Sequence, residues 1–180
     1  MSGLHPFSAL RGRKLHLGVC GSVAAYKAVE LMRALQKLGV SVSVTLTESA
    51  ARFVTPLTFE SLGAVMVHTR MFGQDDGAQF AHLLPGQMAD AFLIAPATAA
   101  TLARLAAGMA DDMLAAQVLA FEGPLVLAPA MNPRMWNNPA TQCNVSLLQQ
   151  RGAHVVQPVS GKVACGDDGR GKLADLPELA

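Results

Sequence analysis

One stretch of the sequence places a neutral amide among large apolar side chains: PAMNPRMW, at residues 129–136. It follows an apolar run at 124–128 and precedes a helix that should begin near 138–139, so it lies where a strand ends and a helix begins. In open α/β sheets this is the edge at which ligands bind. Asn132 can donate two hydrogen bonds there and accept others. Three side chains would form an apolar wall beside it: Met131, Met135 and Trp136. From spacing alone, a loop with a packing tryptophan and a capping asparagine is the simpler interpretation.

A second candidate is the turn that follows the strand predicted at 15–19. Gly21 and Ser22 lie between this strand and an amphipathic helix predicted at 23–38, which Gly39 should end. The exposed N–H groups and the dipole of a helix N-terminus favour a phosphate. The turn lacks the GxGxxG spacing of dinucleotide-binding proteins. It therefore predicts either a mononucleotide phosphate site or an ordinary tight turn, with equal weight.

The next strand indicates a second hydroxyl-bearing end at the same sheet edge. Valine and leucine alternate with serine and threonine from 40 to 46, the period of a strand. Thr47 and Ser49 follow directly. They could contact the same phosphate, or Ser49 could cap a helical turn at 50–53.

The remaining pattern predicts a three-layer, Rossmann-like (flavodoxin-like) parallel sheet with helices on both faces, in one domain. The apolar run at 91–95 is typical of a central parallel strand. Residues 1–13 are expected to be a lead-in to a domain at 14–180. Further strands are expected at 65–68 and 153–156, and a loop at 70–80. Helices are expected at 54–63, after the proline-led turn at Pro96 through Ala107, from 111 or 112 to 120, and at 139–151.

Two other residues could take part in chemistry. Cys165 lies in a glycine-rich segment at 157–175 that has no helical or strand period and is typical of a mobile covering flap. Such a segment cannot bury the thiol deeply, whereas Cys20 and Cys143 are expected to be buried apolar residues. His82 lies among apolar neighbours, where a histidine is more often structural.

The composition excludes several classes. The chain has 180 residues, 51% of them hydrophobic, and a net charge of +1, which predicts a globular protein without a nucleic-acid footprint. No apolar run is long enough to span a bilayer or to serve as a signal peptide. The 3 cysteines have no paired spacing, which argues against a disulfide framework and a metal site and favours the cytoplasm. Only 15% of the residues are charged, so we expect apolar surface to be buried between subunits.

Several strings together resemble one family. PAMNPRMW is similar to the PxMNxxMW signature of the flavin-dependent cysteine decarboxylases. GSVAAYK at 21–27 resembles their phosphate loop, PATAAT at 96–101 their PASANT motif, and HLLPGQMAD at 82–90 their histidine segment. SGKVACGDDGRGKLAD at 160–175 resembles their substrate-covering flap, whose cysteine marks the coenzyme A branch. Two departures stand out: Ala100 replaces the PASANT asparagine, and Pro85 is expected to break the helix near His82.

The resemblance implies FMN as the cofactor and 4'-phosphopantothenoylcysteine as the substrate, decarboxylated to 4'-phosphopantetheine through a thioaldehyde and an enethiol. It implies His82 as the base of the oxidative half, Asn132 as the group that holds the substrate carboxylate, and Cys165 as the proton donor to the enethiol. Met131 and Met135 would contact the substrate. The positions that would surround FMN are Gly21, Ser22, Val23, Thr47, Ser49, Thr98, Ala99, Ala100, Thr101 and Ala130.

The resemblance also implies a homo-oligomer, a trimer or a dodecamer built from trimers, with flavin at the subunit interfaces. Many bacterial members carry a phosphopantothenate–cysteine ligase domain after this one. Three alternatives stay open: a peptidyl-cysteine decarboxylase or flavin prenyltransferase of the same fold, a non-catalytic FMN-binding regulatory subunit, and a dinucleotide-binding dehydrogenase domain. The flap cysteine and PAMNPRMW argue against the first, and the three candidate catalytic residues together argue against the second. The missing GxGxxG argues against the third.

Overall fold

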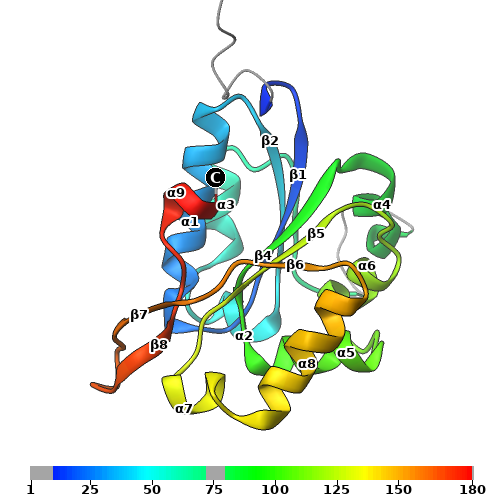
Figure 1. Ribbon diagram of the computed structural model, residues 1–180. Helices are drawn as coiled ribbons and strands as arrows, with labels where there is room; N and C mark the ends of the chain where they lie inside the picture. The colour runs from blue at the N-terminus through cyan, green and yellow to red at the C-terminus, as the bar shows by residue number, and fades with distance from the viewer. Residues whose placement is uncertain (1–9, 72–79, 180) are drawn as a thin grey trace, which may run out of the picture.

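The chain folds into an open parallel sheet between two layers of helices (Figure 1). The computed structural model describes residues 10–71 and 80–179. Six strands pair in the order β3-β2-β1-β4-β5-β6, and every pair is parallel. This confirms the predicted fold class. The strands are β1 (Lys14–Val19), β2 (Ser41–Leu46), β3 (Val67–His68), β4 (Ala91–Ala97), β5 (Leu125–Pro129) and β6 (His154–Val155).

The helices divide between the two faces of the sheet (Figure 1). One face carries α1 (Tyr26–Lys37), α3 (Pro56–Ser61) and α9 (Leu176–Leu179). The other carries α4 (Leu84–Met88), α5 (Ala99–Ala107), α6 (Met113–Leu119) and α8 (Pro139–Gln150). Two short helices, α2 (Glu48–Ala51) and α7 (Pro133–Trp136), follow the carboxyl ends of strands, and two 3-10 turns precede longer helices, η2 (Val23–Ala25) and η3 (Ala81–Leu83).

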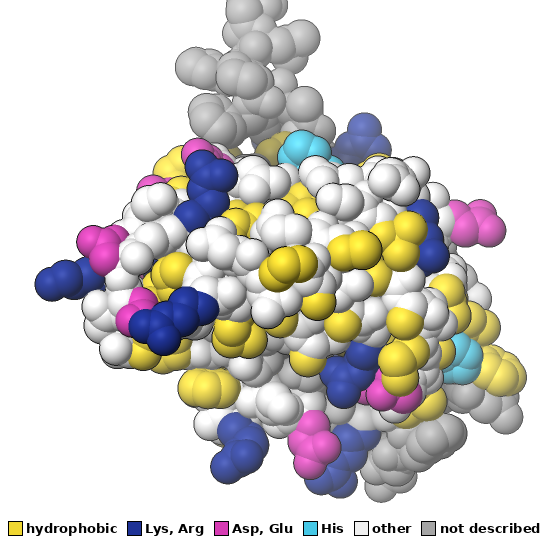
Figure 2. Space-filling view, turned by 60° about the horizontal axis from the view of Figure 1, so that its bottom comes forward, with side chains coloured by type: hydrophobic (Ala, Val, Ile, Leu, Met, Phe, Trp, Pro, Cys, Tyr) yellow, Lys and Arg dark blue, Asp and Glu magenta, His cyan; other side chains and the backbone are white. Residues whose placement is uncertain are grey.

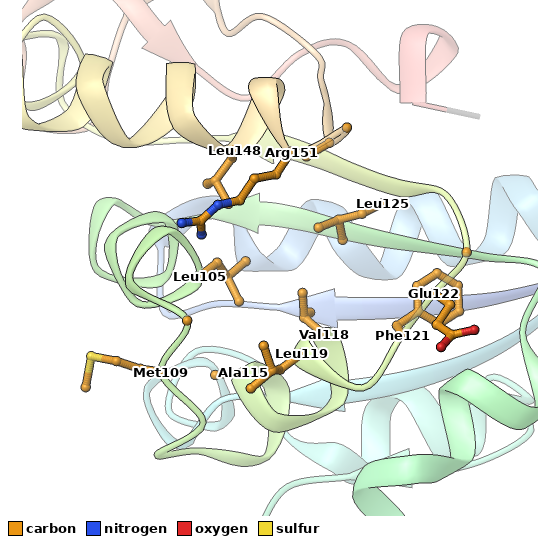
Figure 3. A pocket seen from close by; sticks show the side chains of 14 residues that line it. Leu105, Met109, Ala115, Val118, Leu119, Phe121, Glu122, Leu125, Leu148 and Arg151 are labelled. Carbon is orange, nitrogen blue, oxygen red and sulfur yellow. The ribbon is translucent and has the colours of Figure 1, made fainter.

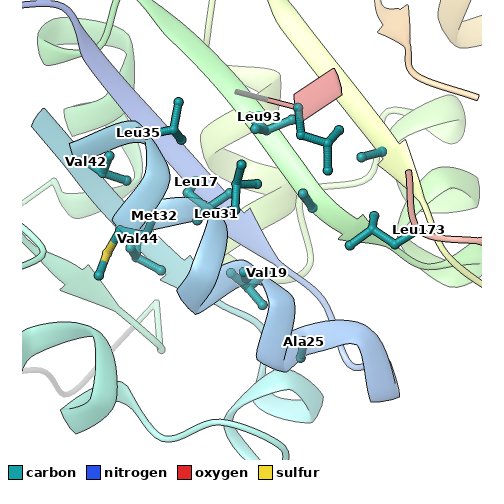
Figure 4. Close-up of a cluster of buried hydrophobic side chains, with 14 of the residues drawn as sticks. Leu17, Val19, Ala25, Leu31, Met32, Leu35, Val42, Val44, Leu93 and Leu173 are labelled. Carbon is teal, nitrogen blue, oxygen red and sulfur yellow. The ribbon is translucent and has the colours of Figure 1, made fainter. Parts of the chain in front are cut away.

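Alternation along the strands builds a core on each face. Leu17 and Val19 of β1 are fully buried against Leu31 and Met32 of α1 (Figure 4). Each such side chain contributes about 1.5–3 kcal/mol when it leaves water. The opposite face of β1 presents Gly18, where an added Cβ would lie 2.6 Å from Leu114 Cδ1. The missing side chain therefore lets α6 pack closely on the sheet.

The ends of the elements follow the predicted signals with one correction. Ser22 caps the chain as expected, but its first turn is η2, and the α-helix begins at Tyr26. The prediction of Ser49 as a cap is wrong, because the Ala50 N–H donates to the Thr47 hydroxyl at 3.2 Å. Thr47 directly follows β2 in an extended conformation, which lets its hydroxyl turn back onto the helix. Gly39 ends α1 at a φ of +83°, a conformation that favours glycine.

The segment at 157–175 differs from its prediction, since it contains two strands. β7 (Val159–Lys162) and β8 (Asp168–Lys172) pair as an antiparallel hairpin. Most of their side chains are exposed or half-buried, so no alternation of apolar residues was needed to build them. The hairpin lies against α7, at the carboxyl edge of the sheet, where the Met131 N–H donates to the Gly171 carbonyl at 2.9 Å (Figure 1).

Three further expectations were wrong. Pro85 does not break a helix: it occupies the first turn of α4, where no intrahelical N–H is needed. Cys143 is exposed on α8, although Cys20 is buried as expected. Trp136 is only 3% exposed and belongs to the core on the α5, α6 and α8 face of the sheet. It is not among the described residues that line the cavities beside Asn132 and Met135.

Candidate active site

Asn132 is held at the carboxyl edge by the start of α7. Its Oδ1 accepts a hydrogen bond from the Arg134 N–H at 2.8 Å, which caps the helix. The cap turns the amide nitrogen toward the hairpin. Nδ2 donates to Cys165 Sγ at 3.1 Å and to Asp167 Oδ2 at 2.7 Å. Two of the three residues predicted to be catalytic thus lie in hydrogen-bond contact, although they are 33 positions apart in the sequence.

Close backbone packing brings Cys165 to this place. A Cβ at Gly171 would lie 2.4 Å from the Met131 carbonyl oxygen and 3.1 Å from the Pro133 nitrogen, so only glycine allows the hairpin to approach. At the tip, the Val163 N–H donates to the Asp167 carbonyl and the Gly166 N–H to the Val163 carbonyl, both at 2.9 Å. The tip is therefore a closed turn that carries the thiol over Asn132.

Asn132 and Cys165 line a cavity of about 460 Å³ between α1, α7 and the hairpin. Three lysines line the same cavity, Lys27, Lys162 and Lys172, and none of the described residues in its wall is acidic. This charge suits an anionic ligand. Its remaining lining residues are Ser22, Val23, Ala24, Tyr26, Ala130, Met131, Val163, Ala164, Gly171 and Leu173.

A second cavity of about 380 Å³ lies beside the first and shares three of its residues, Ser22, Ala130 and Met131. Nine of the ten residues predicted to surround a flavin line it, all except Val23, which lines the first cavity. The complete lining is Gly21, Ser22, Thr47, Ser49, Thr98, Ala99, Ala100, Thr101, Arg104, Ala130, Met131 and Met135. The wall is formed by residues that follow β1, β2, β4 and β5, as expected of a ligand site in such a sheet.

The chemistry of this second wall fits a phosphate ester. Four hydroxyl-bearing residues line it: Ser22, Thr47, Ser49 and Thr98. Thr98 also caps α5, since its hydroxyl accepts a hydrogen bond from the Thr101 N–H at 3.3 Å. A Cβ at Gly21 would lie 2.3 Å from Ser49 Cβ, so glycine keeps the two turns in contact. Hydroxyls and a helix N-terminus are groups that bind phosphate.

Sequence reasoning missed Arg104, the one basic side chain among the described residues that line the second cavity. It lies one helical turn after Ala100, and this i+4 spacing could have placed it on the same face of α5. Its guanidinium already pairs with Asp111 at 3.2 Å and with Asp112 at 3.5 Å. The two carboxylates hold Arg104 at the rim of the cavity and offset its charge.

His82 lies elsewhere. It belongs to η3, is half-buried, and its ring lies edge-on to Phe80 with the centroids 6.4 Å apart. His82 is not among the described residues that line the two cavities. Figure 1 shows α4, which directly follows η3, on the opposite side of the molecule from α7 and the hairpin. One chain therefore joins Asn132 and Cys165 but leaves His82 apart from them.

Two buried titratable groups have structural surroundings. Burial raises the pKa of the Cys20 thiol to about 11, and its sulfur accepts a hydrogen bond from the Thr101 hydroxyl at 3.2 Å. Burial, and then the nearby His68, lowers the pKa of His16 to about 3. A thiol that stays protonated and an imidazole that stays neutral are poor candidates for proton transfer near pH 7.

Another cavity, of about 290 Å³, lies between the ends of α5, α6 and α8 (Figure 3). Its labelled lining is mostly aliphatic, with Glu122 and Arg151 as the charged members. The Arg151 guanidinium donates to the Ala106 carbonyl at 2.7 Å, so it joins α8 to α5. No Ser, Thr, Cys, His or Lys is found among the described residues that line it, and we assign it no chemistry.

The described ranges, 10–71 and 80–179, lack two kinds of feature. They contain no group of three or more His, Cys, Asp or Glu side chains that could hold a metal ion. They also contain no helix that is both long and apolar enough to cross a membrane.

The fold and its two adjoining cavities define an α/β protein with a hydroxyl-lined cavity, suited to a phosphate-bearing ligand, at the carboxyl edge of a parallel sheet. The chain belongs to the flavoprotein family, whose model, described as Flavoprotein, matches residues 6–180. It is 45% identical over 169 residues to a probable phosphopantothenoylcysteine decarboxylase of Streptococcus mutans, covering 93% of this chain and 94% of that one. It is 46% identical over 167 residues to the coenzyme A biosynthesis bifunctional protein CoaBC of Mycolicibacterium smegmatis, of which it spans only 40%.

Solved structures agree with this family. A PPC decarboxylase mutant complexed with pantothenoylaminoethenethiol superposes with a TM-score of 0.82 at 29% identity, covering 94% of each chain. The FMN-dependent cysteine decarboxylase SpaF gives a TM-score of 0.80 at 34% identity and also covers 94% of each chain.

Proposed function

We propose that this chain is an FMN-dependent decarboxylase that converts 4'-phosphopantothenoylcysteine to 4'-phosphopantetheine in coenzyme A biosynthesis. The observation that carries the proposal is the contact of Asn132 with Cys165, 3.1 Å from nitrogen to sulfur, in a basic cavity that adjoins a hydroxyl-lined one. Family membership and the names of the relatives support the same activity.

The second cavity is the proposed place of the cofactor. Ser22, Thr47, Ser49 and Thr98 would hold the phosphate, and the small side chains of 99–100 and Ala130 leave room for a flat ring. Bound FMN supplies an acceptor and donor of two electrons beside the substrate. Ala100 offers no amide at its position, so the hydrogen bonds to a ring there would come from backbone N–H groups and the threonines.

Asn132 is proposed to bind the substrate carboxylate through its Nδ2. A neutral amide suits this task, because the carboxylate must become neutral CO2 and a cationic partner would stabilise the ground state more than the transition state. The cap to Arg134 fixes the amide, so its nitrogen already points into the cavity. The cysteine moiety of the substrate would then lie close to the Cys165 thiol.

Cys165 is proposed to return a proton to the enethiol that remains after CO2 leaves. A positioned cysteine thiol is one of the side chains that can act as a general acid. The exposed tip of the hairpin gives the thiol access to the cavity, in contrast to the buried Cys20. Asn132 lies close enough to stabilise the thiolate that forms.

His82 is proposed as the base that accepts the thiol proton of the substrate during oxidation. Because it is remote from Asn132 in one chain, we propose that a second copy supplies it, in a homo-oligomer such as a trimer. Exposed apolar side chains support such an interface, including Phe80 at 59% and Tyr26 at 55% exposure. The carboxyl edge of the sheet shows hydrophobic side chains across its middle, with charged ones around it (Figure 2).

The proposal extends to the setting of the enzyme. This chain spans about two-fifths of the length of the bifunctional relatives that it matches. We propose that a phosphopantothenate–cysteine ligase, fused or separate, supplies the substrate. All three cysteines are free of disulfides, which fits a reducing cytoplasm.

The decisive experiment starts with the absorbance spectrum of the purified protein. A flavin spectrum, followed by CO2 release from 4'-phosphopantothenoylcysteine under argon and return of the oxidised spectrum, is the expected result. A flavin that is reduced once and stays reduced would favour decarboxylation without return of the hydride and proton to the product, as expected of a peptidyl-cysteine decarboxylase. A colourless protein that takes up no FMN would overturn the proposal.

A further inference from the structure

We propose that Asp167 is a specificity-determining residue: its carboxylate occupies the amide of Asn132 in the ligand-free protein and yields that place to the carboxylate of the substrate. The inference rests on the proposed role of Asn132 as the carboxylate-binding group. It adds a residue of the hairpin whose function neither the family resemblance nor the chemistry above requires.

The hydrogen bonds of Asn132 leave no donor for a ligand. An asparagine amide has two N–H donors. One is directed to Asp167 Oδ2 at 2.7 Å and the other to Cys165 Sγ at 3.1 Å, while Oδ1 is engaged by the Arg134 N–H. The amide cannot rotate to present new donors without losing the cap of α7. A substrate carboxylate must therefore replace one of the two hairpin groups.

Asp167 is the group that the substrate would replace. Its carboxylate has the same charge and the same acceptor geometry as the carboxylate of the cysteine moiety. Two carboxylates at one amide would repel each other, whereas a neutral thiol and a carboxylate can share its two N–H groups. The substrate carboxylate would also form a charge-assisted hydrogen bond to Asn132, as Asp167 does, whereas the bond to the neutral thiol is weaker. Exchange of one carboxylate for the other therefore keeps the strong bond at Asn132.

Arg134 can pair with the Asp167 carboxylate after that carboxylate leaves the Asn132 amide. Arg134 Nη2 lies 3.6 Å from Asp167 Oδ1, on the oxygen that does not contact Asn132. The Arg134 side chain is 85% exposed and free to follow the carboxylate outward. The exchange therefore needs a rotation of the Asp167 side chain, while the backbone turn between Val163 and Asp167 can stay closed.

This arrangement makes a prediction about ligands that differ only in the carboxylate. The alanine analogue of the substrate keeps the carboxylate but lacks the thiol, so it cannot react. The corresponding N-ethyl amide is the same molecule without the carboxylate. Only the first must displace Asp167, so only its affinity should depend on the charge at that position.

The test compares the FMN-loaded wild type with Asp167→Asn and with Asp168→Asn, a matched loss of charge at the exposed neighbouring residue opposite Lys162. Inhibition constants of both ligands are measured against turnover of 4'-phosphopantothenoylcysteine. In Asp167→Asn the alanine analogue should bind about 5-fold more tightly, the difference between a charged and a neutral hydrogen bond. The N-ethyl amide should bind with unchanged affinity, and Asp168→Asn should leave both constants unchanged.

Other outcomes overturn the inference. If Asp167 only stabilises the closed hairpin, Asp167→Asn weakens both ligands alike; if it has no role, neither constant changes. Wild-type turnover in the same assay tests the proposed function separately, so a working wild type with unaltered inhibition constants counts against the inference alone. Hydrogen exchange of residues 159–172 adds a readout without substrate: the alanine analogue should slow it more in Asp167→Asn than in the wild type, and equal slowing contradicts the proposal.

Discussion

The two parts of the proposed active site are held by different forces. The corner that contains Asn132 and Cys165 depends on backbone packing, with Gly171 pressed against the Met131 carbonyl and a capped α7 beneath it. The segment that contains His82 depends on buried side-chain hydrogen bonds. Gln117 Nε2 donates to the carbonyl of Ala81, the residue directly before His82, at 3.4 Å.

The hydrogen bonds behind His82 continue into the sheet. The Thr45 hydroxyl donates to Gln117 Oε1 at 2.7 Å, so it accepts from His16 Nε2 at 2.8 Å. His16 Nδ1 is then left to accept from the Ser43 hydroxyl at 2.7 Å. A neutral imidazole satisfies this chain, and burial disfavours the protonated form. The comparison teaches that one chain brings Asn132 and Cys165 together by itself, whereas the proposed role of His82 requires a second copy.

The strongest test of this difference mixes two inactive variants. His82→Asn and Cys165→Ser should each lose most turnover, by about 10²–10⁴-fold, the usual contribution of a positioned acid or base. If His82 reaches the site of another copy, dissociated and reassembled mixtures should regain activity, because some sites then combine an intact His82 with an intact Cys165. Turnover is measured as CO2 release per FMN.

The control for mixing is a second pair, Asn132→Ala with Cys165→Ser. Both residues belong to the same corner, so every mixed site keeps one defect and no activity should return. Recovery in this pair, or none in the first pair, would contradict a site shared between copies. Retention of the flavin spectrum in each variant shows that the cavity for the cofactor has been preserved.

The next effect concerns stability at low pH. The pKa of His16 is lowered by burial, and then by His68, from 6.5 to about 3, so the unfolded chain binds a proton before the folded one does. Its contribution is therefore complete above about pH 6.5 and is lost as the pH falls toward 3. Between pH 7 and pH 4 the loss should be about 3 kcal/mol of unfolding free energy.

Urea unfolding of His16→Gln at several pH values checks this. The variant should be less stable at pH 7 but should lack the His16 part of the slope between pH 6.5 and 4. His154→Gln, at an exposed position of β6, should keep the wild-type slope. A wild-type slope in His16→Gln would show that other groups govern the acid response.

The sheet and its helices were predictable because burial leaves a period in the sequence. Alternation along β2 and the continuous run of β4 follow from one or both faces being covered. Gly39 and Gly108 ended their helices as expected, since both adopt positive φ. Ser22, Thr47 and Ser49 could be expected to lie together because strand ends in a parallel sheet meet at one edge. The other residues of the second cavity were expected only from the family resemblance.

Other features leave no such pattern. The hairpin buries few side chains, so β7 and β8 lacked a period and looked irregular. The contact between Asp167 and Asn132 joins residues 35 positions apart, and no local spacing predicts it. The separation of His82 from Asn132 also depends on strand order, which sequence periodicity does not determine.

A smaller effect should follow from Gly171→Ala, which disturbs the packing of the hairpin against α7, beside Asn132 and Cys165. The new Cβ would meet the Met131 carbonyl at 2.4 Å, and overpacking of this kind costs about 1–3 kcal/mol. The hairpin should open, so Cys165 no longer returns the proton and reduced flavin accumulates during turnover. Stopped-flow absorbance detects this. Ser160→Ala, an exposed change in the same hairpin, should behave as the wild type, and a Gly171→Ala enzyme that reoxidises its flavin at the normal rate would contradict the packing argument.

The smallest expected effect belongs to Arg134→Gln, which removes the second partner of Asp167. The pair is 3.6 Å apart with an 85% exposed guanidinium, and such surface pairs contribute little. Without Arg134, the displaced Asp167 carboxylate loses the ion pair that stabilises it away from Asn132. The inhibition constant of the alanine analogue should therefore rise by about 2-fold at low salt. The change should disappear at high salt, because screening removes the pair in the wild type as well. An effect of the same size on the N-ethyl amide would show that Arg134 acts on the cavity directly, and the exchange of carboxylates would lose its second step.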